Sequence, residues 1–530
     1  MSVASHKERS GLTRRTVVGL LWAAWGKTAH AVLQLAILAV LARLLAPADF
    51  GVVSAALVVI GFSGIFSQLG LGPALVQRRE LEDRHTDSAF VASIAFGLVL
   101  GGMVWIAAPY AAAFFRIAEV KPVLRALAVV FPLQGVNVVA ESLAKRELRF
   151  RWLANVDVIA YGLGYGLVGI ALAAYGLGVW ALVWGEIAKT VLRDVLLLAD
   201  RRPRVSRLPD RSALRELLYF GGGFTLGRIA NYLALQGDAL VVGRMLGPAA
   251  LGLYGRAHQL MTAPAIGLGG MLDNVLFPAM ARVQGEPDRL AAAYRRGVGL
   301  LAVTMLPFSL TTILLAPEIV RVLLGPNWTA VVVPFQILAV GMTFRTSYKM
   351  SDSLARATGA VYRRAWRQIV YASLVIGGAF VGQRWGLSGV AAGIVTALAV
   401  NFTLMANLSL SLVPLTWSDF GRAHLPAVAL TTVIAPVVWL STEVARQAGL
   451  SPIIVLICGS VPAAIAMGVA VKLAPRAFLG DEALWAATTL RSSLTRRRGS
   501  VGSGRAAVAH VTSPDESDAL EAVGRTGNTR

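Results

Sequence analysis

Long apolar runs separated by short polar stretches fill most of the chain, from Val17 to Lys472. An α-helix rises 1.5 Å per residue, so about 20 apolar residues span a bilayer core about 30 Å thick. We count about fourteen runs of this length. The first, Val17 to Ala42, is too long for a signal-peptide core and predicts a spanning helix. The pattern predicts an all-α integral membrane protein with about fourteen transmembrane helices.

The polar segments between these runs carry their positive charge unevenly. If the amino terminus lies inside, 26 Lys and Arg residues fall on the inner side and eight on the other. Positive residues concentrate in cytoplasmic loops. We therefore predict a multi-pass membrane protein with both termini in the cytoplasm. The eight outer residues are Arg43, Arg116, Lys121, Arg125, Arg244, Arg321, Arg384 and Arg446.

An internal repeat divides the apolar region. The segment Arg43 to Gly51 matches Arg244 to Gly252 at an offset of 201 residues, with Arg, Leu, Pro, Ala and Gly in common. The same offset pairs Lys27 with Arg228. An offset of six spans keeps the topology, so the halves are expected to be parallel repeats about an axis along the membrane normal. A second, shorter match pairs Ala108-Pro109 with Ala316-Pro317.

The repeat and the charge runs predict a domain organisation. Two six-helix lobes are expected, followed by two further helices and a basic, Gly- and Ser-rich tail that is largely disordered. The predicted parts are a cytoplasmic segment 1–16, an N-lobe 17–200, a basic linker 201–216, a C-lobe 217–413, two helices within 414–473 and a cytoplasmic tail 474–530.

Composition narrows the class of protein. Hydrophobic residues make up 56% of the chain and charged residues 15%, which excludes an ordinary soluble protein. The net charge of +21 is dispersed over short loops, so we expect no nucleic-acid partner. The single cysteine, Cys458, leaves no disulfide framework. No Walker motif, paired-His metal spacing or catalytic constellation occurs, so we expect no ATP hydrolysis, catalytic residue, metal or bound cofactor.

Charged residues inside apolar spans are the candidate functional residues. Each costs about 2.5–3.5 kcal/mol at a helix centre, so such residues mark a ligand pathway or an internal pair. The cations within the spans outnumber the acids at similar depth, chiefly Asp157, Asp238 and Asp273. This excess of positive charge favours an anionic ligand such as pyrophosphate. The alternative is pairing within the bundle, for example of Arg345 and Lys349 with Asp352. The predicted ligand-binding cations are Lys27, His30, Arg228, Arg256, Arg345 and Lys349.

Uncharged polar residues lie beside these cations. Gln34 shares a helical face with Lys27 and His30, and Asn231 shares one with Arg228. Tyr161 and Tyr165, four residues apart, can stack on sugar rings or simply pack. We predict these four as sugar contacts. Asp238 and His30 are candidate sites for coupling to H⁺ or Na⁺.

Several spaced motifs resemble one known family, the Wzx-like and colanic-acid-exporter-like polysaccharide flippases. The resemblance covers about Gly19 to Val413. It implies the fold of the multidrug/oligosaccharidyl-lipid/polysaccharide exporter superfamily, shared by MATE- and MurJ-like exporters, with a V-shaped centre between two lobes. The motifs are Ala42 to Gly51, Gln68 to Leu71, Val76 to Arg78, Gly178 to Trp180, Val242 to Gly247, Leu251 to Tyr254 and Leu315 to Val320.

The resemblance also implies a location in the bacterial inner membrane, a cargo and a role. The cargo would be an undecaprenyl-pyrophosphate-linked oligosaccharide, flipped by alternating access for exopolysaccharide, capsule or lipopolysaccharide biosynthesis. Partners would be this cargo, membrane lipids and a polysaccharide polymerase with its export machinery. Two alternatives stay open: an ion-coupled multidrug or small-molecule antiporter of the same fold, and a non-transporting component of a polysaccharide synthase complex. A membrane glycosyltransferase is disfavoured because the outer loops are short.

Overall fold

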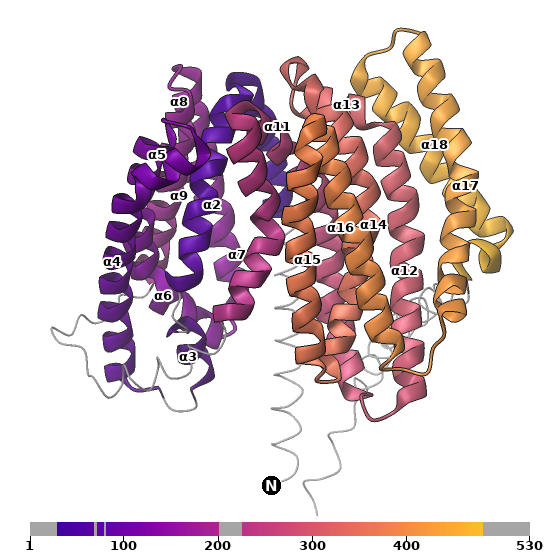
Figure 1. The fold of residues 1–530 in the computed structure, drawn as a ribbon, viewed down its shortest axis with the longest axis horizontal. Helices are drawn as coiled ribbons and strands as arrows, with labels where there is room; N and C mark the ends of the chain where they lie inside the picture. Colours follow the sequence, from indigo (N-terminus) through magenta and orange to yellow (C-terminus); the bar gives the residue numbers. More distant parts are fainter. Residues whose placement is uncertain (1–28, 68–70, 79–80, 201–224, 481–530) are drawn as a thin grey trace, which may run out of the picture.

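The computed structural model describes residues 29–67, 71–78, 81–200 and 225–480. Within these ranges the chain is helical and forms two lobes side by side (Figure 1). The first lobe contains the helix Ala29–Leu44, α2 (Pro47–Ser67), α3 (Leu71–Gln77), α4 (Asp83–Phe115), α5 (Val120–Leu127), α6 (Val130–Arg146), α7 (Phe150–Ile159), η1 (Ala160–Val168), α8 (Gly169–Ala174) and α9 (Val179–Asp200).

The second lobe follows α9 after a segment outside the described residues. It is built on α11, α12, α14, α15 and α16, and α17 and α18 lie at its far edge (Figure 1). Its elements are α11 (Thr225–Arg282), α12 (Pro287–Leu314), α13 (Ala316–Leu323), η3 (Pro326–Val331), α14 (Val332–Ala357), α15 (Val361–Gly382), η4 (Gln383–Trp385), α16 (Gly386–Leu410), α17 (Trp417–Gln447) and α18 (Pro452–Leu473).

Long apolar helices confirm the predicted class. Nine helical stretches of the described residues are long and apolar enough to cross a membrane, and Val361–Leu410 contains both α15 and α16. Large apolar side chains on α4 face outward, with Met103 and Ile106 more than 60% exposed, as expected of a surface that meets lipid. The protein is therefore a multi-pass membrane protein. The count of fourteen stays a prediction, and segments 1–16 and 201–216 lie outside the described residues.

The connections between α4 and α6 and between α12 and α14 are largely helical. Each contains a short helix with one apolar face, α5 in the first lobe and α13 in the second. Val120, Val123 and Leu124 of α5 are fully buried. Burial of that face stabilises a helix too short to persist alone in water.

The boundary between the lobes is formed mainly by α2 and α11. α11 is two helical segments joined at Gly247, whose φ of 84° suits glycine. The next segment begins with Pro248, as α2 begins with Pro47. A Cβ on Gly51 would lie 1.8 Å from the Pro248 carbonyl oxygen. The helices are therefore in backbone contact.

The same contact occurs a second time in reverse. A Cβ on Gly252 would lie 1.8 Å from the carbonyl oxygen of Pro47. Gly252 is the repeat counterpart of Gly51, and Pro248 is the counterpart of Pro47. The repeated motif thus packs against its own second copy about a local twofold axis, in agreement with the predicted parallel repeat.

The last two spanning helices are fastened to the second lobe. α17 packs against α12 and α18, and α18 also touches α13. Arg446 of α17 donates from Nε and Nη2 to the two carboxylate oxygens of Glu318 in α13, both at 2.8 Å. This bidentate pair supplies a polar link where Glu318 is only 8% exposed.

Candidate functional site

An aromatic and cationic cluster lies at the lobe boundary. In the first lobe, residues Ala160–Val168 form a π-helix, a wider turn that recurs at functional sites. It carries Tyr161 and Tyr165 with their rings stacked 5.1 Å apart. A Cβ on Gly164 would lie 2.4 Å from the Cα atom of Lys189, so this segment packs directly on α9. Both tyrosines predicted as sugar contacts therefore sit together.

His30 extends this cluster from the first helix. Its ring lies 4.7 Å from that of Tyr161 in an edge-on arrangement. The His30 Nδ1 atom is buried and has no hydrogen-bond partner among the described residues. Lys189 pairs with Glu186 at 2.6 Å, and its Nζ lies 6.0 Å from the centre of the Tyr165 ring. The cluster thus includes Lys189, whose charge is neutralised by Glu186, and the His30 imidazole, whose Nδ1 atom can still form a hydrogen bond.

Arg256 reaches the boundary from the other lobe. Its guanidinium carbon lies 4.7 Å above the ring of Phe50 in α2, in cation–π geometry. Nη1 donates to Gln259, while Nε is buried without a partner within the part of the chain that the structure describes. Arg256 also acts electrostatically on Tyr161 and Tyr165. One cation therefore connects α11 to the aromatic cluster of the first lobe.

A second cluster surrounds Asp238 inside the second lobe. The carboxylate, 3% exposed, accepts hydrogen bonds from the Tyr254 hydroxyl at 2.6 Å and from the Ala239 backbone N–H at 2.8 Å. The His258 Nε2 atom is 3.8 Å away. Arg345 of α14 acts electrostatically on Tyr254 and His258. This cluster contains an acid, a base and a cation, and its charge is more balanced than that around Arg256.

The remaining predicted residues do not all join these clusters. Lys349 lies half-buried in α14, Gln34 is half-buried, and Asn231 is exposed on α11. Asp352 pairs with Arg356 at 3.2 Å and with Arg364. Lys27 lies outside the described residues, as do the side chains of Arg228 and Asp273.

Balanced ion pairs account for several acids of the first lobe. Arg193 binds Glu141 at 3.1 Å and Asp157 at 2.9 Å. Asp157 is therefore not available to neutralise Arg256. Near the end of α9, Arg149 donates two hydrogen bonds to Asp200, and this contact raises the pKa of the Arg149 guanidinium. These pairs join α6, α7 and α9 at one end of the lobe.

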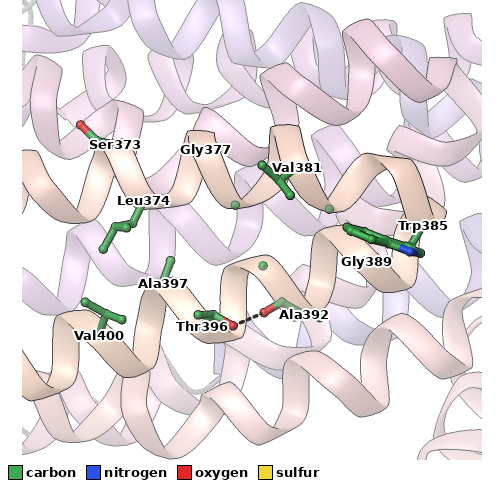
Figure 2. A pocket seen from close by; sticks show the side chains of 13 residues that line it. Ser373, Leu374, Gly377, Val381, Trp385, Gly389, Ala392, Thr396, Ala397 and Val400 are labelled. Carbon is green, nitrogen blue, oxygen red and sulfur yellow. Dashed lines mark hydrogen bonds between the residues drawn. The ribbon is translucent and has the colours of Figure 1, made fainter.

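An apolar groove of about 490 Å³ runs between α15 and α16 (Figure 2). Gly378 packs directly on Gly393 and Gly382 on Gly389, so the two helices approach closely. Trp385 closes one end in Figure 2. None of the predicted site residues lines the groove, and its surface is mostly apolar. It is unsuited to an anionic headgroup and lies apart from the Arg256 cluster.

Phe50 and Tyr254 complete the two clusters and were not among the predicted site residues. Both belong to sequence motifs noted above, Ala42 to Gly51 and Leu251 to Tyr254. Their presence in those motifs was the available signal, but their roles depend on contacts between helices. Among the described residues, no three His, Cys, Asp or Glu side chains come together as a metal site.

Two lobes of membrane-spanning helices meet at this cationic, aromatic cluster, and the solved structures show that the fold is that of MurJ- and MATE-type membrane proteins. Lipid II flippase MurJ in an inward closed conformation matches with a TM-score of 0.68 and 11% identity, covering 86% of this chain and 99% of MurJ. An inward-facing MATE multidrug resistance transporter matches with a TM-score of 0.58 and 18% identity, covering 72% and 95%.

The family described as "Polysaccharide biosynthesis protein" matches residues 40–333, and the chain belongs to it. The teichuronic acid biosynthesis protein TuaB of Bacillus subtilis is 22% identical over 66% of this chain and 72% of its own. The lipopolysaccharide biosynthesis protein WzxC of Escherichia coli is 22% identical over 74% and 80%. The succinoglycan biosynthesis transport protein ExoT of Rhizobium meliloti is 28% identical over 58% and 62%. These matches confirm the resemblance to Wzx-like exporters.

Proposed function

We propose that this protein flips undecaprenyl-pyrophosphate-linked oligosaccharide from the cytoplasmic to the periplasmic leaflet of the bacterial inner membrane. It does so by alternating access, for the biosynthesis of a surface or secreted polysaccharide. The observation that carries the proposal is Arg256, a cation with a buried, unpartnered Nε that lies over the Phe50 ring at the lobe boundary and acts electrostatically on the stacked Tyr161 and Tyr165. Membership of the polysaccharide biosynthesis family supports the same function.

The chemistry of the cluster suits both parts of such a headgroup. A guanidinium binds phosphate oxygens through two parallel N–H groups, which a lysine cannot do. The faces of Tyr161 and Tyr165 can pack on sugar rings. The polyprenyl chain stays in the surrounding lipid, where the outward apolar side chains of the helices provide a matching surface.

The proposed function also fixes the orientation of the protein in the membrane, the residues that couple transport to an ion, and the partner proteins. Both termini lie in the cytoplasm, so the end where α2 begins faces the periplasm. Asp238 and His30 are the proposed coupling sites for H⁺ or Na⁺, since Asp238 has a histidine nearby and His30 has an unpartnered ring nitrogen. A polysaccharide polymerase and its export machinery receive the flipped oligosaccharide.

Complementation tests the role of Arg256. In the native host lacking this gene, Arg256→Ala is expected to reduce polysaccharide export about tenfold or more, because a charged hydrogen bond is worth about 1.5–3 kcal/mol. Arg256→Lys keeps the charge but loses the bidentate geometry, so an intermediate level is expected. The matched control is Arg384→Ala at an exposed arginine. Full export by Arg256→Ala, at equal protein in the membrane, would overturn the assignment.

The two alternative functions predict different results. A non-transporting synthase component would leave no lipid-linked oligosaccharide trapped in the cytoplasmic leaflet after gene deletion, whereas loss of a flippase causes it to accumulate. An antiporter of the same fold would drive efflux of an organic cation from proteoliposomes along an ion gradient. The leaflet distribution of the lipid-linked oligosaccharide in the deletion strain and cation efflux by the purified protein together separate the three functions.

A further inference from the structure

Two arginines cross the lobe boundary at the end where α2 begins. Arg43, at the end of the first helix, donates from Nη2 to the Val322 carbonyl oxygen of α13 at 2.5 Å. Arg244, on α11, donates from Nη1 to the carbonyl oxygens of Ala113 at 3.2 Å and Phe114 at 2.7 Å, at the end of α4. Each arginine therefore binds the last turn of a helix in the opposite lobe.

These two contacts are related by the internal repeat. Arg244 is the counterpart of Arg43 at the offset of 201 residues. Val322 is the counterpart of Phe114 at an offset of 208, the offset that also relates Ala108-Pro109 to Ala316-Pro317. The same guanidinium-to-carbonyl contact is thus built twice, once in each direction across the boundary.

The chemistry of the contacts favours a strong but reversible link. The last four carbonyl groups of a helix lack partners within it, and the C-terminal end carries partial negative charge. A guanidinium satisfies these groups and offsets that charge. Arg43 is exposed and Arg244 is half-buried, so both can exchange their carbonyl partners for water at modest cost.

Aromatic side chains also close the lobe boundary near the arginines, through the contacts of Trp328 with Ala42 and Phe50, here called the Trp328 seal. The Trp328 indole, fully buried, donates from Nε1 to the Ala42 carbonyl oxygen at 2.8 Å. Its ring lies 5.4 Å from that of Phe50, which is in turn under Arg256. The boundary contacts thus run continuously from Arg43 to the proposed headgroup site.

We propose that Arg43 and Arg244 form a symmetric interlobe latch that holds this end of the transporter closed, and that release of both contacts opens the path by which the cargo leaves. The assignment of this end as the exit rests on the proposed function. The latch itself is a property of the lobe boundary. Opening at this end separates α4 from Arg244 and α13 from Arg43, so neither contact survives the change.

Cysteine labelling tests the latch without any cargo. The reporter is Ser54→Cys in a Cys458→Ser background, since the Ser54 hydroxyl lies at the boundary, 3.7 Å from the Cβ position of Gly255. The full chain in nanodiscs is labelled with a maleimide. We expect the rate to rise about threefold in Arg43→Ala or Arg244→Ala and about tenfold in the double variant. Arg321→Ala removes an exposed cation next to Val322 and is expected to change nothing.

A second reporter separates opening from general loosening. Ser142→Cys is buried within the first lobe, 5% exposed, away from the boundary. Its labelling is expected to stay constant in the latch variants. An unchanged rate at position 54 in the double variant, or an equal rise at both positions, would overturn the proposal.

Trp328→Phe replaces the double arginine variant in the labelling experiment if that variant does not fold. It removes the N–H that binds Ala42 but keeps a ring beside Phe50, and about a twofold rise at position 54 is expected. No rise would count against the latch. If the protein does not flip the cargo but labelling at position 54 still rises in the latch variants, the proposed function is wrong and the latch is supported. The two proposals can therefore fail separately.

Discussion

Arg256 and His258 are two residues apart on α11 and have different surroundings. A helix turns about 100° per residue, so positions i and i+2 lie on nearly opposite sides. Arg256 contacts Phe50 of the first lobe, whereas His258 approaches Asp238 within the second. Their neighbours therefore suit them to different parts of the proposed function: anion binding for Arg256, and proton or ion exchange for Asp238 with its neighbour His258.

The Tyr254 hydroxyl is expected to stabilise the buried carboxylate of Asp238. Tyr254→Phe removes a donor 2.6 Å from a side chain that is 3% exposed, which should cost about 1–3 kcal/mol. A lower thermal midpoint in detergent is the measurement. Tyr371→Phe is the matched control, because Tyr371 is equally buried in the same cluster and its hydroxyl has no hydrogen bond among the described residues. Equal midpoints for the two variants would contradict the role of the Tyr254 bond.

At the scale of elements, α2 and α11 touch through backbone because their facing positions are glycine. Gly51 and Gly252 each meet the carbonyl oxygen of a proline that starts the partner helix. Any side chain there would separate the lobes at that end. The close packing of α2 against α11 thus depends on Gly51 and Gly252, which have no side chain.

Gly51→Ala is expected to destabilise the closed boundary by about 1–3 kcal/mol, as overpacking of a tight contact does. The added methyl would lie 1.8 Å from the Pro248 oxygen, so the helices must move apart. Gly64→Ala on the same helix is the control, because a Cβ there meets nothing within 4 Å and alanine favours the helix. Thermal midpoints compare the two, and local symmetry predicts that Gly252→Ala behaves like Gly51→Ala. A neutral Gly51→Ala would show that the helices are not in backbone contact.

For the molecule as a whole, the twofold boundary divides the described chain into two lobes, which the proposed alternating access requires to rock against each other. The latch, the glycine contact and the Trp328 seal lie at one end, while Arg256 and the stacked tyrosines lie along the boundary. Alternating access requires that this end open while each lobe stays intact. A covalent link across the boundary should then stop transport.

Ser54→Cys with Gly255→Cys, in the Cys458→Ser background, provides that link. The two positions approach closely enough for a disulfide, with the Ser54 Oγ atom 3.7 Å from the Gly255 Cβ position. Oxidation is expected to abolish flipping of the lipid-linked oligosaccharide in inverted vesicles, and a reductant should restore it. Each single-cysteine variant under the same oxidant is the control. Undiminished flipping by the cross-linked protein would exclude lobe separation at this point.

Much of the fold follows from local properties of the sequence. Apolar length determines spanning helices, because an unpaired backbone cannot remain in lipid, and the 201-residue offset predicts two parallel lobes. The loop charges predict an orientation. The polar residues within spans mark candidate functional positions, since charge in lipid is costly. These predictions need only composition and spacing.

Contacts between helices were decided by the tertiary structure alone. Helical periodicity places Arg256 on a face of its own helix but does not say that Phe50 lies beneath it. Likewise it does not say that Asp157 binds Arg193 rather than a boundary cation. Pairing depends on distances across the bundle, which spacing along one helix cannot encode. The repeated Arg43 and Arg244 were visible in the sequence, and only the folded chain shows that each binds the opposite lobe.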